Sequence, residues 1–134
     1  MSVQQPGDYG DGLAALIGLE RISSDADRTV ARVPVTDDLR QPFGVVHGGV
    51  YPVIAESICS LATLEAVRDE GLVPLGQANQ ATFMRPIFEG HIHAEATVRH
   101  RGRTTWIWDC ELSDDEGRPC ALVRMTIAVR PKPQ

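Results

Sequence analysis

One long apolar segment in the middle of the chain restricts the fold more than any other feature. From residue 50 to residue 70 the sequence contains a single helix breaker, Pro52, and Gly71 follows directly. Proline is tolerated in the first turn of a helix, and glycine is common just past a helix end. At ~1.5 Å per residue, about 22 residues make a helix of roughly 33 Å. Its first two-thirds is apolar almost all round, which is typical of a helix buried in a core.

Composition places this helix in a soluble domain. The chain has 134 residues, 43% of them apolar, and Glu56 lies inside the apolar segment. The uninterrupted apolar run is too short to span a membrane. The net charge of -5 argues against a general nucleic-acid binder, which needs a strongly basic face. Because the N-terminus lacks the pattern of a signal peptide, a cytoplasmic protein without a membrane partner is expected.

The remaining composition predicts a single domain behind a short arm. Residues 1–12 hold three glycines, a proline and two aspartates, and we expect a flexible N-terminal arm there, with residues 13–134 forming one domain. The three cysteines are Cys59, Cys110 and Cys120, and no CxxC motif occurs. They therefore argue against a disulfide framework or a zinc cluster.

Alternation of apolar and polar residues predicts strands on both sides of the helix. Before it, two short extended segments are expected around residues 18–23 and 29–35. After it, four long strands are expected, within residues 73–84, 92–98, 106–112 and 121–129. Connections of about two to six residues predict an antiparallel meander. One long buried helix against a curved antiparallel sheet is the α+β arrangement known as the hotdog fold.

Glu56 is the residue of the predicted helix that most needs an explanation, because glutamate is almost never fully buried unless it is paired. On a helix, Pro52, Glu56, Ser60 and Thr63 fall on one stripe. Such a stripe fits a solvated helix face, and it also fits a small polar channel that brings a carboxylate to a substrate. The hydroxyls of Ser60 and Thr63 favour the channel.

His47-Gly48-Gly49 precedes the helix directly. Two glycines at a helix N-terminus let a ligand approach the free N–H groups, where the helix dipole favours negative charge. A carbonyl oxygen that becomes an oxyanion would be stabilised there. A tight turn between a loop and a helix, with His47 as a cap or loop residue, would produce the same three residues.

Together these residues resemble the hotdog-fold acyl-CoA thioesterases. Within that family the sequence looks most like the 4-hydroxybenzoyl-CoA thioesterases of the actinobacterial type. The resemblance runs from about residue 35 to residue 131 and is carried by Gln41-x-x-Gly44-x-x-His47-Gly48-Gly49 followed by Glu56. Further matches lie at residues 35–37, 76–77, 83–86, 89–91, 104–109 and 128–131.

The resemblance implies a role for each matched residue. Glu56 corresponds to the catalytic carboxylate, which acts as nucleophile or general base. The backbone N–H of Gly48 and the side chain of Gln41 would polarise the thioester carbonyl, and His47 joins these catalytic candidates through the same motif. Ser60 stands where the relative carries threonine, and its hydroxyl would orient the carboxylate or the water. At the next position, 61, a leucine replaces a second glutamate of the relative, so any role of that acid is absent.

The resemblance also implies contacts with coenzyme A. Arg85 and Thr104 match positions that contact the nucleotide, whereas Arg103 replaces a small hydroxyl residue. Arg85, Arg101 and Arg103 are candidate phosphate ligands on an otherwise acidic protein, although exposed arginines at strand ends would look the same. Coenzyme A arrives as part of the substrate, so no separate cofactor is expected. His91-x-His93 could face a metal, but without a third ligand at suitable spacing we expect an exposed pair and no metal site.

The predicted function is hydrolysis of an acyl-CoA thioester to a carboxylate and free coenzyme A, with an aromatic acyl group such as 4-hydroxybenzoyl. A hotdog dehydratase or hydratase is one alternative, because it also pairs a helix acid with a histidine. Those enzymes typically place the histidine in a His-Phe-Pro-like loop, which this chain lacks. A non-catalytic acyl-CoA-binding module, in which Glu56 is structural, is the other alternative.

Helix geometry predicts that two chains share each site. Gly48 and Glu56 are eight residues apart, which is roughly 12 Å along a helix. A reacting carbonyl needs its oxyanion donor and its attacking group within about 3–3.5 Å. We therefore expect a homodimer, or a dimer of dimers forming a homotetramer. Each site would combine Gly48 and Gln41 of one chain with Glu56 and Ser60 of its partner.

Overall fold

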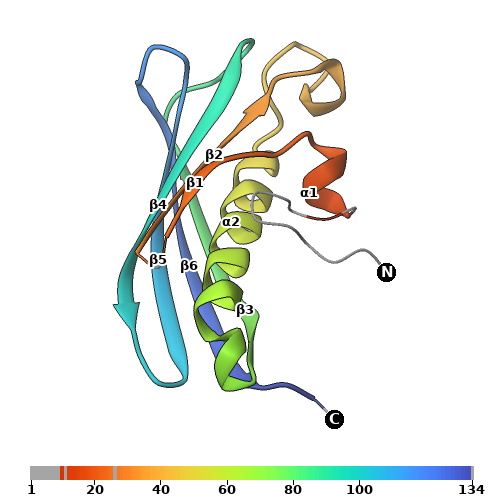
Figure 1. Cartoon of the computed structure of the whole chain (residues 1–134). Coiled ribbons are helices and arrows are strands. Elements are labelled where there is room, and N and C mark those ends of the chain that lie inside the picture. The colour runs from red at the N-terminus through yellow and green to blue at the C-terminus, as the bar shows by residue number, and fades with distance from the viewer. Residues whose placement is uncertain (1–9, 11, 26, 134) are drawn as a thin grey trace.

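A six-stranded antiparallel sheet curves around one long helix, α2 (Val50–Val67), in a computed structural model that describes residues 10, 12–25 and 27–133 (Figure 1). The strands lie in the order β1-β2-β4-β5-β6-β3. Their bounds are β1 Glu20–Ser24, β2 Arg28–Pro34, β3 Leu72–Phe83, β4 His91–Arg101, β5 Thr105–Ser113 and β6 Pro119–Pro131. The predicted α+β hotdog arrangement is confirmed.

Short helical turns complete the chain. A four-residue helix, α1 (Leu13–Leu16), lies beside α2 and was not predicted from the sequence. Two 3-10 turns, η1 (Asp37–Leu39) and η2 (Arg68–Glu70), precede and follow α2. Most of the predicted arm at residues 1–12 lies outside the described residues.

The helix α2 ends slightly earlier than predicted. Its α-helical part stops at Val67, and the last turn before Gly71 is the 3-10 turn η2. Gly71 has φ 74°, a left-handed conformation that favours glycine, so its predicted role as the stop is confirmed. Residues 50–70 are long and apolar enough to cross a membrane, but half of that window is buried within the protein. Because α2 packs on the sheet, this segment is the core helix of the domain.

The predicted meander is correct for β4, β5 and β6 and wrong for β3. Instead of pairing with β4, β3 pairs along its whole length with β6, at the far side of the sheet. The chain from β3 to β4 contains Pro86, which ends the strand, and it crosses the end of the sheet. Its backbone is held there, because Met84 N–H donates to Cys120 at 2.8 Å and Ile87 C=O accepts from Val46 at 2.8 Å.

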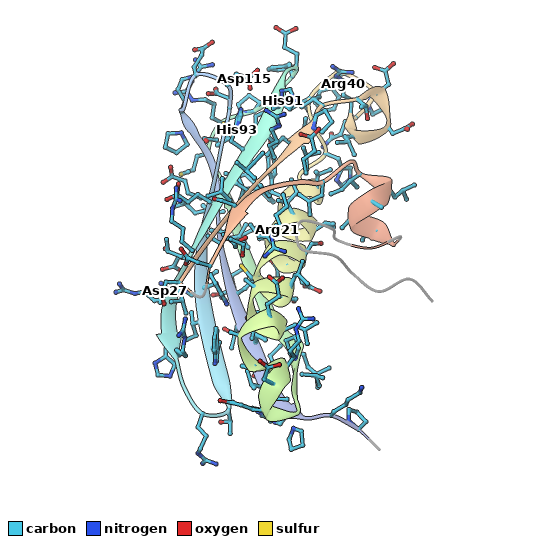
Figure 2. The ribbon with its side chains drawn as sticks, in the orientation of Figure 1. Arg21, Asp27, Arg40, His91, His93 and Asp115 are labelled. Atoms are coloured by element: carbon cyan, nitrogen blue, oxygen red, sulfur yellow. The ribbon has the colours of Figure 1, made fainter. Side chains whose placement is uncertain are left out.

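The core lies between α2 and the inner face of the sheet. Both tryptophans pack inside it, with Trp106 at 4% and Trp108 at 0% exposure. At the sheet edge, Arg21 of β1 forms an ion pair with Glu65 of α2 and so ties the edge strand to the helix (Figure 2). The buried side chains of α2 and the alternate residues of β4, β5 and β6 form one continuous cluster.

Thr63 belongs to this core and not to the stripe of Glu56. Around the helix Thr63 is only about 20° from Glu56, but it lies seven residues, or roughly 10 Å, further along the axis. The Thr63 side chain is fully buried, donates to the Cys59 carbonyl at 2.8 Å and accepts from Trp108 Nε1 at 3.0 Å. The prediction that Thr63 lines a polar channel is therefore wrong, because its hydroxyl satisfies the buried indole N–H.

Replacing Thr63 with valine tests this structural role. Valine has nearly the same shape but leaves the buried Trp108 N–H without an acceptor, so the free energy of unfolding should fall by about 1–3 kcal/mol. Urea unfolding followed by tryptophan fluorescence measures this loss. Thr63→Ser retains the hydroxyl and should lose less. A Thr63→Val variant as stable as the original protein would contradict the assignment.

Candidate active site

Glu56 lies in the second turn of α2, and its side chain is exposed in the single chain. Its carboxylate lies against strand β3. Asn79 Nδ2 is 3.4 Å from Glu56 Oε1, and a Cβ atom added at Gly76 would lie 3.6 Å from the carboxylate carbon. The helix thus holds the backbone of Glu56, while the strand holds its carboxylate.

A cavity of about 520 Å³ opens beside this carboxylate, between α1, α2 and β3. Glu56 is the single ionisable side chain among the described residues that line it. Ser60, one turn after Glu56, lines the same cavity and is half-buried. The rest of the lining is largely apolar: Leu13, Ala14, Pro52, Val53, Leu61, Leu64 and Pro74. The cavity can therefore accept an apolar group next to one carboxylate.

His47, Gly48 and Gly49 form the turn into α2, as predicted. His47 Nδ1 accepts the Gly49 N–H at 2.9 Å, so this imidazole caps the start of the helix. The Gly48 N–H has no hydrogen-bond partner among the residues that the structure describes. The ring of Phe83 covers Gly48 closely, because a Cβ added there would lie 3.3 Å from Phe83 Cζ. Gly48 thus offers a free N–H in a place where a larger side chain would be crowded.

Gln41 lies in the loop before this turn. Its backbone closes the loop, since Gln41 N–H donates to Val45 at 2.8 Å and Gln41 C=O accepts from Gly44 at 2.8 Å. The glycine at position 44 has φ 97°, which explains why glycine is suited to that turn. Neither Gln41 nor Gly48 is among the residues that line the Glu56 cavity. One chain therefore presents the predicted catalytic residues as two separate groups.

The candidate phosphate ligands are also divided. Arg85 is exposed and lies beside Cys120 at the start of β6, where its N–H donates to the Cys120 carbonyl at 3.2 Å. Thr104 and Arg103 are exposed in the turn between β4 and β5, and the Thr104 carbonyl accepts from Val129 at the other end of β6. Nine residues of strand separate these ends, which is roughly 30 Å. Figure 1 shows this turn at the end of the sheet opposite the loops before α2.

The side chain of Arg101 contacts other parts of the protein. Its guanidinium lies 4.5 Å from the centre of the Trp106 ring and donates to Asp27 at 2.9 Å. In the same turn, Arg130 donates to the Thr104 carbonyl at 2.6 Å. These contacts order the β4–β5 turn around Thr104.

The two histidines of the His91-x-His93 pair contact a carboxylate that was not predicted from the sequence. Asp115, from the turn between β5 and β6, lies 2.7 Å from His93 Nε2 and accepts the His91 N–H at 3.3 Å (Figure 2). The hydrogen bond from His93 holds the pKa of Asp115 below its usual value. A side chain at Gly90 would collide with Asp115, since a Cβ there would lie 2.1 Å from Oδ2. No group of three side chains suited to a metal ion occurs within the described part of the chain.

Sequence reasoning missed Asn79. Its signal was present, because asparagine is disfavoured in the middle of a strand. Its importance depends, however, on which face of β3 turns toward α2, and no local pattern in that polar stretch reveals the face.

Comparisons with known proteins identify the family. The profile of the thioesterase superfamily matches residues 43–121, which include Gly48, Glu56 and Asn79. A mutant thioesterase PA1618 of Pseudomonas aeruginosa has a similar structure, with a TM-score of 0.85 and 35% identity over 90% of this chain and 86% of that chain.

Two further relatives carry more specific names. The 1,4-dihydroxy-2-naphthoyl-CoA hydrolase of Listeria monocytogenes is 31% identical over 90% of this chain and 98% of its own length. The proofreading thioesterase EntH of Klebsiella pneumoniae is 32% identical over 87% of this chain and 85% of its own length. With its fold, its helix carboxylate and these matches, the chain belongs to the thioesterase superfamily and is an enzyme of the thioester-hydrolase class.

Proposed function

We propose that this protein hydrolyses an acyl-CoA thioester to a carboxylate and free coenzyme A, with Glu56 as nucleophile or general base. The observation that carries the proposal is the carboxylate of Glu56, the one ionisable group among the described lining residues of a largely apolar cavity. A carboxylate so placed can attack a thioester carbonyl or take a proton from a water molecule. Ser60, on the next turn of the helix, would orient the carboxylate or the water.

We propose further that the active enzyme is a homodimer, or a dimer of dimers. Support comes from β3, which is the last strand of the sheet and has no strand on its outer side among the described residues. A long unpaired strand edge readily pairs with another chain. The Glu56 cavity lies beside this edge, because Pro74 and Asn79 of β3 line it. A partner there would bring its own Gly48 N–H and Gln41 side chain toward Glu56.

The residues proposed to contact coenzyme A are also divided between two chains. Arg85 and the pair Arg103 and Thr104 lie at opposite ends of the sheet in one chain. A single nucleotide would therefore meet both groups only if they came from different chains. Arg101 would then act in support, by holding the turn that carries Thr104.

The acyl group we propose is aromatic, as in 4-hydroxybenzoyl-CoA or a related ester. The apolar lining of the cavity supports this choice, because Glu56, Ser57, Ser60 and Asn79 are its only polar residues among those described. A relative that shares 31% identity is named for an aromatic acyl-CoA, the dihydroxynaphthoyl ester. We place the enzyme in the cytoplasm, where acyl-CoA esters are available.

A thiol-release assay tests this function. We expect free coenzyme A to appear from benzoyl-type and phenylacetyl-type esters faster than from short aliphatic esters. A hydratase would instead add water to an enoyl-CoA without releasing thiol, and a binding module would bind the esters without turnover. Absence of thiol release from every ester of the panel would refute the proposal.

A further inference from the structure

Asn79 is a polar residue in the middle of β3 that faces the helix α2. It is directly opposite Met125 in the pairing of β3 with β6, and Met125 is fully buried. Neighbouring residues on a strand point to opposite faces, so Asn79 lies on the inner face and Gln80 on the outer face. Gln80 is paired with Arg124, which forms an ion pair with Asp109 on the outer face.

The orientation of the Asn79 amide follows from its contacts. Nδ2 lies 3.0 Å from the Pro52 carbonyl oxygen and 3.4 Å from Glu56 Oε1. Both of these oxygens can only accept hydrogen bonds when the carboxylate is ionised, so the NH₂ group must face them. An NH₂ group has two hydrogens, one for each acceptor. The backbone of the first helical turn thus anchors the amide, and the amide in turn holds the carboxylate.

The carbonyl oxygen of the Asn79 amide lacks a hydrogen-bond donor among the described residues, and this lowers the stability of the folded protein. Asn79 Oδ1 is buried and accepts no hydrogen bond within the described part of the chain. A buried carbonyl oxygen without a donor destabilises a folded protein. Leucine or valine at this position would avoid that cost and would suit a strand better. The contact with Glu56 explains why an amide is useful here.

Gly76 is the second residue of β3 that lies against the Glu56 carboxylate. A Cβ atom there would lie 3.6 Å from Glu56 Cδ and 3.7 Å from Oε2. The register of β3 against β6 shifts between Gly76 and Ala78, so Gly76 and Asn79 flank an irregularity of the strand. Glu56 Oε1 therefore faces Asn79, and Oε2 lies over Gly76.

We propose that Asn79 is a positioning residue, which fixes the Glu56 carboxylate on β3 in the orientation needed for attack on the thioester. This inference rests on the proposed function, because it needs Glu56 to be the reacting group. A glutamate side chain rotates about several bonds, and catalysis requires its oxygen to stay within about 0.5 Å of the productive position. A fixed amide supplies that restraint before the substrate binds.

Replacing Asn79 with leucine tests the restraint. Loss of one hydrogen bond to a charged group should lower kcat by roughly 10- to 100-fold. KM should change little, because Asn79 acts on Glu56 and not on the coenzyme A nucleotide. In a Glu56→Gln background the same substitution should cost nothing further. Gln80→Leu, a matched change on the outer face, should leave kcat within about twofold of the original.

Asn79→Asp keeps the shape of the side chain and adds a second carboxylate beside Glu56. Like charges at this separation disfavour the ionised pair, so the acidic limb of the kcat/KM profile should move upward by about one pH unit. Glu56 is the one ionisable side chain that the described residues of a single chain contribute to the cavity lining. Gln80→Asp adds the same charge on the other face and should leave the limb in place.

Thermal unfolding tests the contact without any substrate. In Asn79→Asp the two carboxylates repel when both are ionised, so its melting temperature should fall further below the original as the pH rises from 4 to 7. That growing deficit should become clearly smaller when Glu56 is also replaced by glutamine, leaving the part that comes from burial of the new carboxylate. An equal deficit in both backgrounds would overturn the contact, even if the protein released no thiol from any ester.

The two proposals fail in different ways. If the original protein hydrolyses thioesters and Glu56→Gln abolishes turnover, while Asn79→Leu and Asn79→Asp keep the original kcat and pH profile, then Asn79 has no positioning role and the proposed function stands. If the original protein hydrolyses no thioester, the proposed function fails and the positioning role fails with it.

Discussion

Replacing Glu56 with glutamine should lower kcat by roughly 100- to 10,000-fold, the range observed when a group that performs acid–base chemistry is removed. Glutamine has almost the same shape, but its amide neither attacks a carbonyl nor takes a proton from water at neutral pH. KM should change far less, because the substrate makes most of its contacts elsewhere. Stopped-flow or steady-state thiol release with the best ester of the panel measures both constants.

The matched control is Glu70→Gln, which removes the same charge from an exposed position in η2 after the helix. It should retain nearly all activity, and both variants should keep the original melting temperature and circular dichroism. If Glu56→Gln retained turnover within a factor of a few, Glu56 would be neither nucleophile nor base. The alternative of a structural acid in a binding module would then be favoured.

Oxygen isotopes separate the two roles left open for Glu56. If Glu56 attacks the thioester, it forms a mixed anhydride, and water that attacks the enzyme carbonyl of that anhydride leaves its oxygen in the glutamate. A single turnover in ¹⁸O-water, followed by mass spectrometry of the Glu56 peptide, would detect that label. Direct attack by water activated by Glu56 would label only the product.

Local patterns were enough to predict most of the secondary structure. The apolar segment and Gly71 predicted α2, because helix ends depend on nearby residues. Alternation predicted β5 and β6, since every second side chain of each strand is buried. The catalytic candidate Glu56 could also be predicted from the sequence, because a charged residue inside an apolar helix is unusual and needs a functional or structural reason.

Features that depend on pairing between distant strands could not be predicted in the same way. No local pattern in β3 predicts that it pairs with β6. The pairing partner depends on how the connection at residues 84–90 crosses the sheet. The role of Asn79 depends in turn on this pairing and its register. For Thr63, the helical direction is nearly that of Glu56, and the packing of Trp108 of β5 against its hydroxyl, a contact between distant segments, places it in the core.

Two inactive variants should restore activity when they are combined, if two chains share each site. Glu56→Gln removes the proposed catalytic carboxylate, and Gly48→Val crowds the proposed oxyanion N–H, because a Cβ added at Gly48 would lie 3.3 Å from Phe83 Cζ. Each homodimer then has two defective sites. In a heterodimer of the two variants, one site collects both defects and the other contains neither. Co-expression with two different affinity tags isolates this heterodimer.

The isolated heterodimer should recover about half of the original activity, since one of its two sites is intact and independent sites contribute additively. If Gly48→Val does not fold, Gln41→Ala removes a member of the same group and takes its place. The geometry of α2 makes the result decisive, because roughly 12 Å of helix separates Gly48 from Glu56 within one chain. A heterodimer that forms and stays inactive would show that each chain builds its own site, so that one flexible loop must bring Gln41 and Gly48 to the Glu56 of the same chain.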